Sequence, residues 1–282
     1  MLDSKTIKQI NDFVYAKPRT IQEIAGLIKK NWRTADKYVE SVAKETGSLS
    51  VRVFREGTKG ALKIVYWNNI EQIHSSEFQE KLFNKIESVH KKEEFSPFDL
   101  YQYVKEGRRN AVMLNVGKAS SKDNLIKHLK QANSQVLSFS GNLSWINEIE
   151  NNEKLINIIE NLVKRNVTIK ILSRVTIDSI KNIQKIMQIN EKTGKNLIEV
   201  RHRDQPLRGF VIDNHIARFR EVRDPSDYER GELDERILLF YEIFDKEWIE
   251  WLQKVFWYLF RTAIPAEKRI KDLKTIRNIY RV

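Results

Sequence analysis

Polar and apolar positions alternate with a helical period from about residue 20, which predicts a helix. Thr20 and Glu23 form a capping box at its start, an arrangement that satisfies the free amides of a first helical turn. Its apolar face consists of Ile21, Ile24, Ala25 and Ile28. An earlier helix is predicted within residues 1–16, with an apolar face of Ile7, Ile10, Phe13 and Val14.

A second helix is predicted after a break at Lys30 and Asn31, where Asn31 serves as the N-cap. Gly47 ends this helix, because glycine readily takes the left-handed conformation that follows a helix. The face expected to pack on the preceding helix consists of Ala35, Val39 and Val42. The opposite face carries Arg33, Thr34, Lys37, Glu40, Ser41 and Lys44.

Two strand-like runs follow at once, at residues 50–55 and 61–67, joined by a turn at 56–60 that contains Gly57 and Gly60. Helices followed by a hairpin with basic residues near its tip are typical of a winged helix-turn-helix, here residues 1–70. In that fold the second helix enters the DNA major groove and the wing contacts the backbone. The alternative is a small packed subdomain whose basic residues are simply solvated.

The candidate DNA-binding residues lie on the second helix and on the hairpin. Arg33 and Lys37 are expected to contact bases or phosphates, since the start of this helix reaches the base edges. Arg55 and Lys59 are expected to contact phosphates. Trp32 either contacts the sugar-phosphate backbone or packs against the first helix. The full predicted set is Arg33, Thr34, Lys37, Ser41, Lys44, Arg52, Arg55 and Lys59.

The net charge of +12 is concentrated at the two ends of the chain. Residues 1–67 contain 13 Lys and Arg against 7 Asp and Glu, a net of +6, and residues 261–282 contain 7 against 2, a net of +5. The middle of the chain is close to neutral. Because DNA affinity arises largely from counterion release at phosphates, basic ends agree with DNA binding.

Residues 71–120 are predicted to form a helical linker, with one helix at about 71–92 and another opened by Ser96 and Pro97. From 121 onwards helices alternate with apolar strands, which predicts an α/β domain over residues 121–262. Its predicted strands are 136–140, 167–172, 197–201, 209–213 and 216–222, the last two joined by a hairpin at Asp213 and Asn214. Its predicted helices are 121–132, opened by Ser121, then 151–165, 178–192 and 248–260.

Three segments of this region resemble the phospholipase-D-like domain that follows a winged helix in TrmB-type archaeal transcription regulators. They are FSGNLSW (139–145), VTIKIL (167–172) and RHRDQPLRGFVIDNHIARF (201–219). The resemblance implies a regulator fold composed of α+β and α/β parts: a winged helix-turn-helix, a linker and a C-terminal phospholipase-D-like domain. It also implies a second domain that provides dimerisation and effector sensing.

Active phospholipase-D-type enzymes carry a His-x-Lys-x4-Asp motif, in which the histidine is the nucleophile. With Asp213 as the aspartate, Arg208 takes the lysine position and Pro206 the histidine position. His202 lies four residues too early, and His215 has no lysine at the required spacing. We therefore expect a catalytically degenerate domain and no enzyme. Arg208 and Asp213 either line an effector pocket or form a structural ion pair.

The helix at 248–260 carries aromatic residues around much of its circumference, which suggests a second buried face and thus a dimer interface. Dimerisation is expected for a helix-turn-helix regulator, because two half-sites require two-fold symmetry. A basic helix is predicted over residues 263–282. It either adds a DNA contact or docks through Ile270, Leu273, Ile276, Ile279 and Tyr280.

The sequence has no cysteine, so it excludes disulfides and thiolate chemistry. Its five histidines lack the spacing of a metal site, and we expect no metal and no cofactor. Neither a signal peptide nor an apolar run of ~18 residues is evident, which predicts a soluble cytoplasmic protein.

The sequence as a whole predicts a homodimeric transcription regulator that binds double-stranded DNA sequence-specifically, with a small-molecule effector as a further candidate partner. Two alternatives stay open: a non-specific architectural DNA-binding protein, and a phospholipase-D-type nuclease, which Pro206 argues against.

Overall fold

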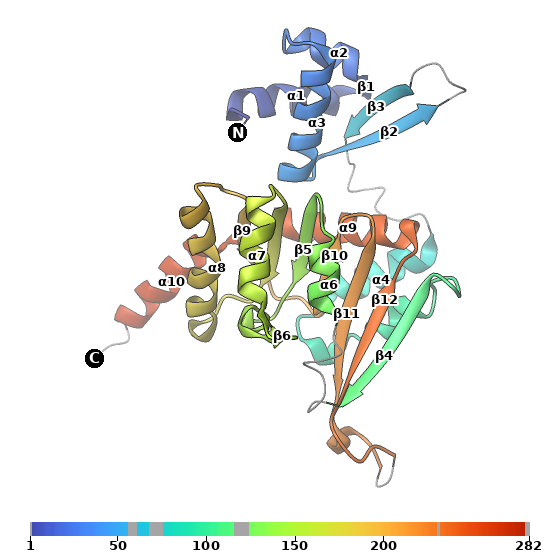
Figure 1. Ribbon diagram of the computed structural model, residues 1–282, viewed down its shortest axis with the longest axis vertical. Coiled ribbons are helices and arrows are strands. Elements are labelled where there is room, and N and C mark those ends of the chain that lie inside the picture. The colour runs from blue at the N-terminus through green and yellow to red at the C-terminus, as the bar shows by residue number, and fades with distance from the viewer. Residues whose placement is uncertain (1, 56–60, 68–75, 116–123, 230–231, 280–282) are drawn as a thin grey trace. The chain divides into compact units, whose positions relative to one another are not determined.

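The computed structural model describes residues 2–55, 61–67, 76–115, 124–229 and 232–279 (Figure 1). The chain divides into two compact units, residues 1–73 and 74–282. Each unit is described on its own below.

The first unit consists of three helices and a three-stranded antiparallel sheet of order β1-β3-β2. In chain order its elements are α1 (Ser4–Ala16), β1 (Arg19–Thr20), α2 (Ile21–Leu27), α3 (Trp32–Thr46), β2 (Leu49–Arg55) and β3 (Ala61–Trp67). The sequence predicted this order of helices and hairpin, apart from the short β1. The predicted turn at 56–60 lies outside the described residues.

The predicted helix boundaries of this unit are confirmed by their hydrogen bonds. Glu23 N donates to Thr20 Oγ1 at 3.1 Å, and Thr20 N donates to Glu23 Oε2 at 2.7 Å, which completes the capping box. Thr34 N donates to Asn31 Oδ1 at 2.9 Å at the start of α3. Gly47 ends α3 with a φ of 63°, a left-handed conformation that favours glycine. The core joins all three helices to the hairpin and includes Ile10, Val14, Ile24, Ala35, Val39, Val42 and Val65.

The second unit is built on an eight-stranded mixed sheet. Its order is β13-β9-β8-β5-β10-β11-β12-β4, and β5, β8 and β9 run parallel while the other neighbours are antiparallel. The strands are β4 (Arg109–Asn115), β5 (Gln135–Phe139), β8 (Thr168–Ser173), β9 (Ile198–His202), β10 (Gly209–Ile212), β11 (Ile216–Arg223), β12 (Ile237–Ile243) and β13 (Ile264–Pro265). A separate small hairpin pairs β6 (Ile149–Glu150) with β7 (Glu153–Lys154).

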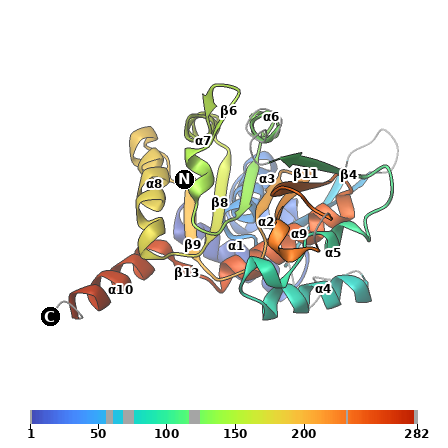
Figure 2. The same ribbon diagram turned by 90° about the horizontal axis from the view of Figure 1, so that it is seen from below.

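Helices cover both faces of this sheet (Figure 2). Those of the second unit are α4 (Glu77–Ser88), α5 (Phe98–Tyr101), α6 (Leu125–Lys130), α7 (Leu155–Lys164), α8 (Ile180–Thr193), α9 (Lys246–Arg261) and α10 (Ala266–Ile279). Alternate residues of each inner strand point to opposite faces. Ile169 and Ile171 of β8 therefore join the core beneath α6, α7 and α8. Phe139 of β5 instead meets Phe256 of α9 edge to face, with ring centroids 5.2 Å apart.

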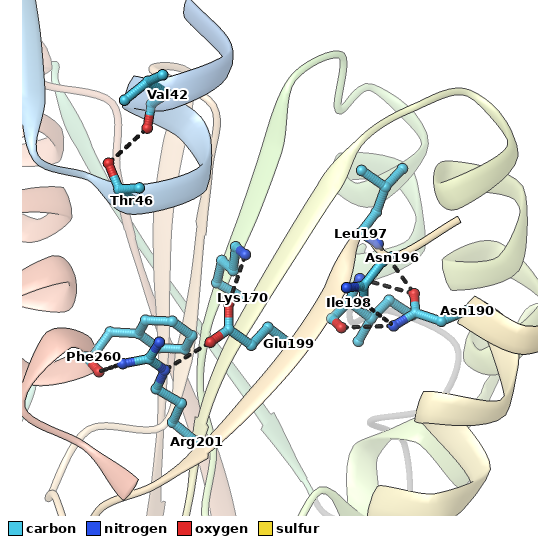
Figure 3. Close-up of polar contacts among 10 residues, drawn as sticks. All are labelled: Val42, Thr46, Lys170, Asn190, Asn196, Leu197, Ile198, Glu199, Arg201 and Phe260. Atoms are coloured by element: carbon cyan, nitrogen blue, oxygen red, sulfur yellow. Dashed lines mark hydrogen bonds and ion pairs between the residues drawn. The ribbon is translucent and has the colours of Figure 1, made fainter. Parts of the chain in front are cut away.

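Polar contacts link the parallel strands to one another and to neighbouring helices (Figure 3). Lys170 Nζ lies 2.8 Å from Glu199 Oε2, and Arg201 Nε lies 2.7 Å from Glu199 Oε1. Arg201 Nη1 also donates to the carbonyl of Phe260 at 3.1 Å, which ties β9 to the end of α9. On the opposite face, Asn190 Oδ1 accepts from the amides of Leu197 and Ile198 at the start of β9.

The sequence-based description of residues 71–120 as a helical linker needs correction. The helix α4 is present, but β4 lies in the same segment and forms an edge of the large sheet beside β12. β12 itself was not predicted. Residues 76–115 therefore contribute the helices α4 and α5 and the strand β4 to the second unit. The proposed cap at Ser121 lies outside the described residues, and α6 begins at Leu125.

The prediction of surplus apolar surface on the aromatic helix is also wrong. Of the five aromatic residues of α9 on which it rested, Trp251, Phe256, Trp257 and Phe260 are each no more than 5% exposed within one chain, and Trp248 is half-buried. The sheet covers one side, and on the other side the ring of Phe83 from α4 lies 5.0 Å from that of Tyr258. The second buried face thus packs against α4 and is no free dimer surface. Among the described helices, none has both the length and the apolar character needed to cross a bilayer.

Candidate functional site

The polar face of α3 in the first unit carries the candidate DNA-binding residues of the helix. Arg33 and Lys37 are exposed, whereas Thr34, Ser41 and Lys44 are half-buried. Ala35, Val39 and Val42 are fully buried on the other side of α3. This segregation arises from the helical period, since apolar residues at i, i+4 and i+7 leave the intervening basic residues facing water.

Trp32 lies at the start of the same helix and is 55% exposed. The guanidinium of Arg33 lies 5.5 Å from the centre of the indole ring, within cation–π range. More than half of the Trp32 surface is therefore available to a ligand.

The hairpin is fastened to α3 by an ion pair between Lys63 Nζ on β3 and Asp36 Oδ2 on α3, 2.5 Å apart. Arg52 of β2 is exposed and lies opposite Ile64 of β3. Arg55 is the last residue of β2, and Lys59 lies outside the described residues. Of the three hairpin residues in the predicted set, Arg52 is therefore the one whose side chain the structure describes.

The second unit contains a cavity of about 700 Å³ beyond the carboxyl ends of β5 and β8. One wall of the cavity consists of three loop segments. They are residues 140–145 after β5, Arg174 after β8, and Pro206 and Arg208 before β10. Ligands of open α/β sheets commonly bind at the carboxyl ends of parallel strands. The other wall comes from β11 and the segment after it, with Arg218, Arg220, Glu221, Arg223, Asp224 and Asp227.

Arg208 and Asp213 do not form the structural ion pair that was one alternative, and of the two only Arg208 lines the cavity. Arg208 lines the cavity, and its Nη1 donates to the carbonyls of Gln205 and Leu207 at 2.8 and 2.6 Å. Asp213 lies in the turn between β10 and β11 with a φ of 47°. Its carboxylate accepts from the amides of Asn133, Ser134 and Gln135 at 2.7–3.0 Å, and so fixes the chain where it enters β5.

The electrostatics of the cavity centre on Arg208. Burial is the main influence that lowers the pKa of Arg208 to about 10, with the positive charges of Arg174 and Arg220 acting in the same direction and the negative charges of Glu93 and Asp204 against it. An arginine keeps its proton at neutral pH even so. The lowered pKa therefore reflects mainly the burial of the Arg208 guanidinium.

No nucleophilic histidine lines the described walls of this cavity. Pro206 does line it. His202 has a structural contact, because its Nδ1 accepts a hydrogen bond from the amide of Val175 at 3.0 Å. Burial, together with the charge of Arg269, lowers the pKa of His202. Across the described part of the chain, no group of three or more His, Asp or Glu side chains could hold a metal ion.

Sequence reasoning missed Arg174, Arg220 and Trp145 of the cavity wall. Arg174 immediately follows a strand that the sequence did predict, so the rule that sites form at strand ends would have singled it out. Arg220 lay inside a predicted strand, but the sequence did not show which face of the sheet its side chain occupies. Pairing of Arg220 with Phe240 of β12 sets this register, and the side chain lines the cavity.

No known protein family matches the sequence, and no curated protein matches it. Solved structures do resemble it. Nuc from Salmonella typhimurium, a phospholipase D family member, is 10% identical, with 56% of this chain and 97% of the other covered at a TM-score of 0.41. TrmBL2, an archaeal chromatin protein whose structure shows a novel mode of DNA binding, is 14% identical, with 92% and 93% covered, also at 0.41. NucT from Helicobacter pylori is 12% identical, with 56% and 99% covered at 0.39. At such values no residue of this chain inherits a role.

Proposed function

We propose that this protein binds double-stranded DNA through α3 and the β2–β3 hairpin, as a winged helix-turn-helix, and regulates transcription as a homodimer. The observation that carries the proposal is the separation of an exposed basic face from a buried apolar face on α3. Arg33 and Lys37 are exposed near its start, beside the exposed Trp32, while its apolar face is fully buried. A helix presented in this way fits the major groove, and its first turns are those that meet base edges.

The ion pair between Lys63 and Asp36 supports the same proposal. It holds the hairpin against α3, so that a groove-binding helix and a backbone-binding wing keep a fixed relation. The basic balance of residues 1–67 supplies the phosphate attraction.

We further propose that the second unit is not catalytic and serves effector sensing and dimerisation. Pro206 at the position of a nucleophile, and the structural use of His202, support the absence of catalysis. The homodimer is inferred from the geometry of half-sites, because one winged helix covers about one half-site. Its interface lies elsewhere than the aromatic face of α9, which is buried within one chain.

A second candidate function is non-specific architectural binding along DNA. The helix α10 favours it, since Lys268, Lys271 and Lys274 are exposed there while Ala266, Ile270 and Leu273 pack on the core. Exposed lysines contact phosphates without reading sequence.

Footprinting of the full chain on genomic DNA tests the two functions against each other. A regulator gives discrete protected sites with two-fold related halves, and light scattering gives the mass of a dimer. Uniform protection without preferred sites would replace the regulator with the architectural protein. An absence of binding to any duplex at low salt would refute both.

A further inference from the structure

The strand β4 lies at the edge of the large sheet, next to β12 (Figure 1). No other described strand pairs with it. Phe244 N donates to the carbonyl of Arg108 at 2.8 Å, one residue before β4 begins. Hydrogen-bonded and non-hydrogen-bonded residue pairs alternate along an antiparallel ladder, so every second residue of β4 bonds to β12. The residues whose backbone N–H and C=O groups point away from β12 are therefore Arg109, Ala111, Met113 and Asn115.

This edge lacks the features that usually keep the free edge of a sheet from pairing with another strand. Such edges carry lysine or proline, or are broken by a bulge. In β4, residues 110–115 contain neither a charged residue nor a proline, and the pairing with β12 runs over all seven residues without a break. Ala111 and Met113 are exposed beside the free backbone groups, Met113 by 63%. The edge can therefore accept a further strand through main-chain hydrogen bonds.

The charges at the two ends of β4 favour a second copy of this chain as the added strand. Arg109 at the first end carries the only charge of the strand. At the other end, Asn115 Nδ2 donates to Oε1 of the exposed Glu235. Two copies that pair antiparallel about a two-fold axis at Val112 place Arg109 of each copy opposite Asn115 of the other, and thus beside Glu235. Opposite charges then meet at both ends of the paired strands.

We propose that β4 is a dimer interface, at which the β4 strands of two copies pair antiparallel about Val112 and join the two large sheets into one. Ala111 of each copy then lies opposite Met113 of the other, so the outward backbone groups of both bond to one another and the exposed Met113 side chain packs across the interface. The proposal deepens the proposed homodimer by naming its interface, and it rests on that function for the two-fold symmetry.

Cysteine cross-linking of the full chain tests the register. The chain has no cysteine, so a substitution introduces the only thiol. In the proposed register Val112 faces its own copy in a non-hydrogen-bonded pair, with Cα atoms about 4.5 Å apart, a separation that a disulfide can span. Val112→Cys should therefore oxidise to a covalent dimer on a non-reducing gel. Asn115→Cys is the matched control, because its two copies would lie six residues apart along the paired strands, about 20 Å, and should not cross-link.

Light scattering and sedimentation of two further variants test the edge without a thiol. The N–H of Ala111 points away from β12, so Ala111→Pro removes no ladder bond within one chain but removes one between copies. It should raise the dissociation constant of the dimer by about tenfold or more, whereas Ala111→Ser, which keeps the N–H, should leave it within about twofold. Met113→Lys places a lysine on the exposed edge, so it should fold even where the proline variant does not, and it should also favour the monomer.

The outcomes separate this interface from the homodimer itself. A dimer that neither Ala111→Pro nor Met113→Lys dissociates, and that Val112→Cys does not cross-link, would overturn the β4 interface and leave a homodimer formed elsewhere. Equal cross-linking of Asn115→Cys and Val112→Cys would overturn the register. An unaltered chain that is monomeric by light scattering, with no cross-link in Val112→Cys, would overturn both the interface and the homodimer. DNA binding through α3 is measured separately, so its failure leaves the cross-linking result standing.

Discussion

Arg218 on β11 lies directly opposite Glu242 on β12 in the register of the sheet, and its Nε lies 3.4 Å from Glu242 Oε1. Both side chains are buried. Asn110 Nδ2 of β4 donates to Glu242 Oε2 at 3.0 Å, and His128 Nε2 of α6 lies 3.6 Å from Glu242 Oε1. One carboxylate therefore links three strands and a helix, and two of those strands, β4 and β12, were not predicted from the sequence.

Replacement of Glu242 by Gln should destabilise the second unit by about 3 kcal/mol, because the buried Arg218 would lose the charge that neutralises it. Differential scanning calorimetry of the full chain measures the effect. Glu153→Gln is the control, since that residue forms an exposed ion pair with Lys130 and should cost about 0–1 kcal/mol. Equal stability of the two variants would show that the buried carboxylate is not required.

The Glu242 carboxylate should also make the folding stability of the second unit depend on pH. The contact with His128 is the largest influence that holds the pKa of Glu242 below its ordinary value of 4.5, with Asn110 and Arg218 acting in the same direction. A lowered folded pKa gives stability that is present above the unfolded pKa and lost as pH falls through the folded pKa. The difference between the unaltered chain and Glu242→Gln should therefore shrink below about pH 4.5. A difference that grows on acidification would contradict this assignment.

Gly209 at the start of β10 is expected to tolerate no side chain. A Cβ there would lie 2.1 Å from the carbonyl oxygen of Arg218, and a backbone atom of the neighbouring strand cannot move aside easily. Gly209→Ala should cost at least about 2 kcal/mol by overpacking. In contrast, Gly26→Ala in α2 meets nothing within 4 Å and should be neutral or stabilise the first unit by about 0.5–1 kcal/mol. Calorimetry of both variants gives the comparison, and a Gly209→Ala chain as stable as the unaltered protein would refute the close approach.

The sequence predicted the first unit well because its signals are local. A capping box, an N-cap asparagine and a terminal glycine each act within four residues, so α2 and α3 could be placed from neighbouring side chains alone. The inner strands of the second unit were also found, since buried parallel strands are apolar along their whole length. β8 is of this kind.

The missed elements depend on distant partners. β4 is an edge strand with Met113 63% exposed, and it carries little apolar pattern of its own. With α4 assigned to a linker, nothing remained to cover the second face of α9, and its aromatic residues were interpreted as a dimer surface. Asp213 was assigned by analogy with a catalytic motif, whereas its carboxylate binds three amides of a segment about 80 residues earlier. Sequence spacing could not reveal that partner.

For DNA binding, Arg33→Ala and Lys37→Ala should each weaken binding to a footprinted site by about 1–3 kcal/mol if these side chains read bases. Binding to random duplex should weaken less. Fluorescence anisotropy with both duplexes at one salt concentration measures the difference. Lys8→Ala is the control, because it removes an exposed lysine from α1 of the same unit. Equal losses on both duplexes would reduce Arg33 and Lys37 to phosphate contacts, and no loss would remove α3 from the interface.

The second unit should not cleave phosphodiesters. When the phospholipase-D-type motif is aligned on Asp213, Pro206 takes the position of the nucleophile, and a prolyl side chain can neither attack phosphorus nor carry a phosphoryl group. We expect no turnover of bis-(p-nitrophenyl) phosphate, plasmid or single-stranded DNA, with or without a divalent metal.

Asp213→Ala is a poor control, because it would free three amides at the start of β5 and unfold that region. Arg174→Ala serves better, since it alters an exposed residue of the cavity wall. Turnover that is unchanged in this variant would be traced to a contaminant by its separation from the protein peak on a second column. Turnover that follows the protein peak and falls in Arg174→Ala would mean that the cavity is an active site with a nucleophile other than the motif histidine.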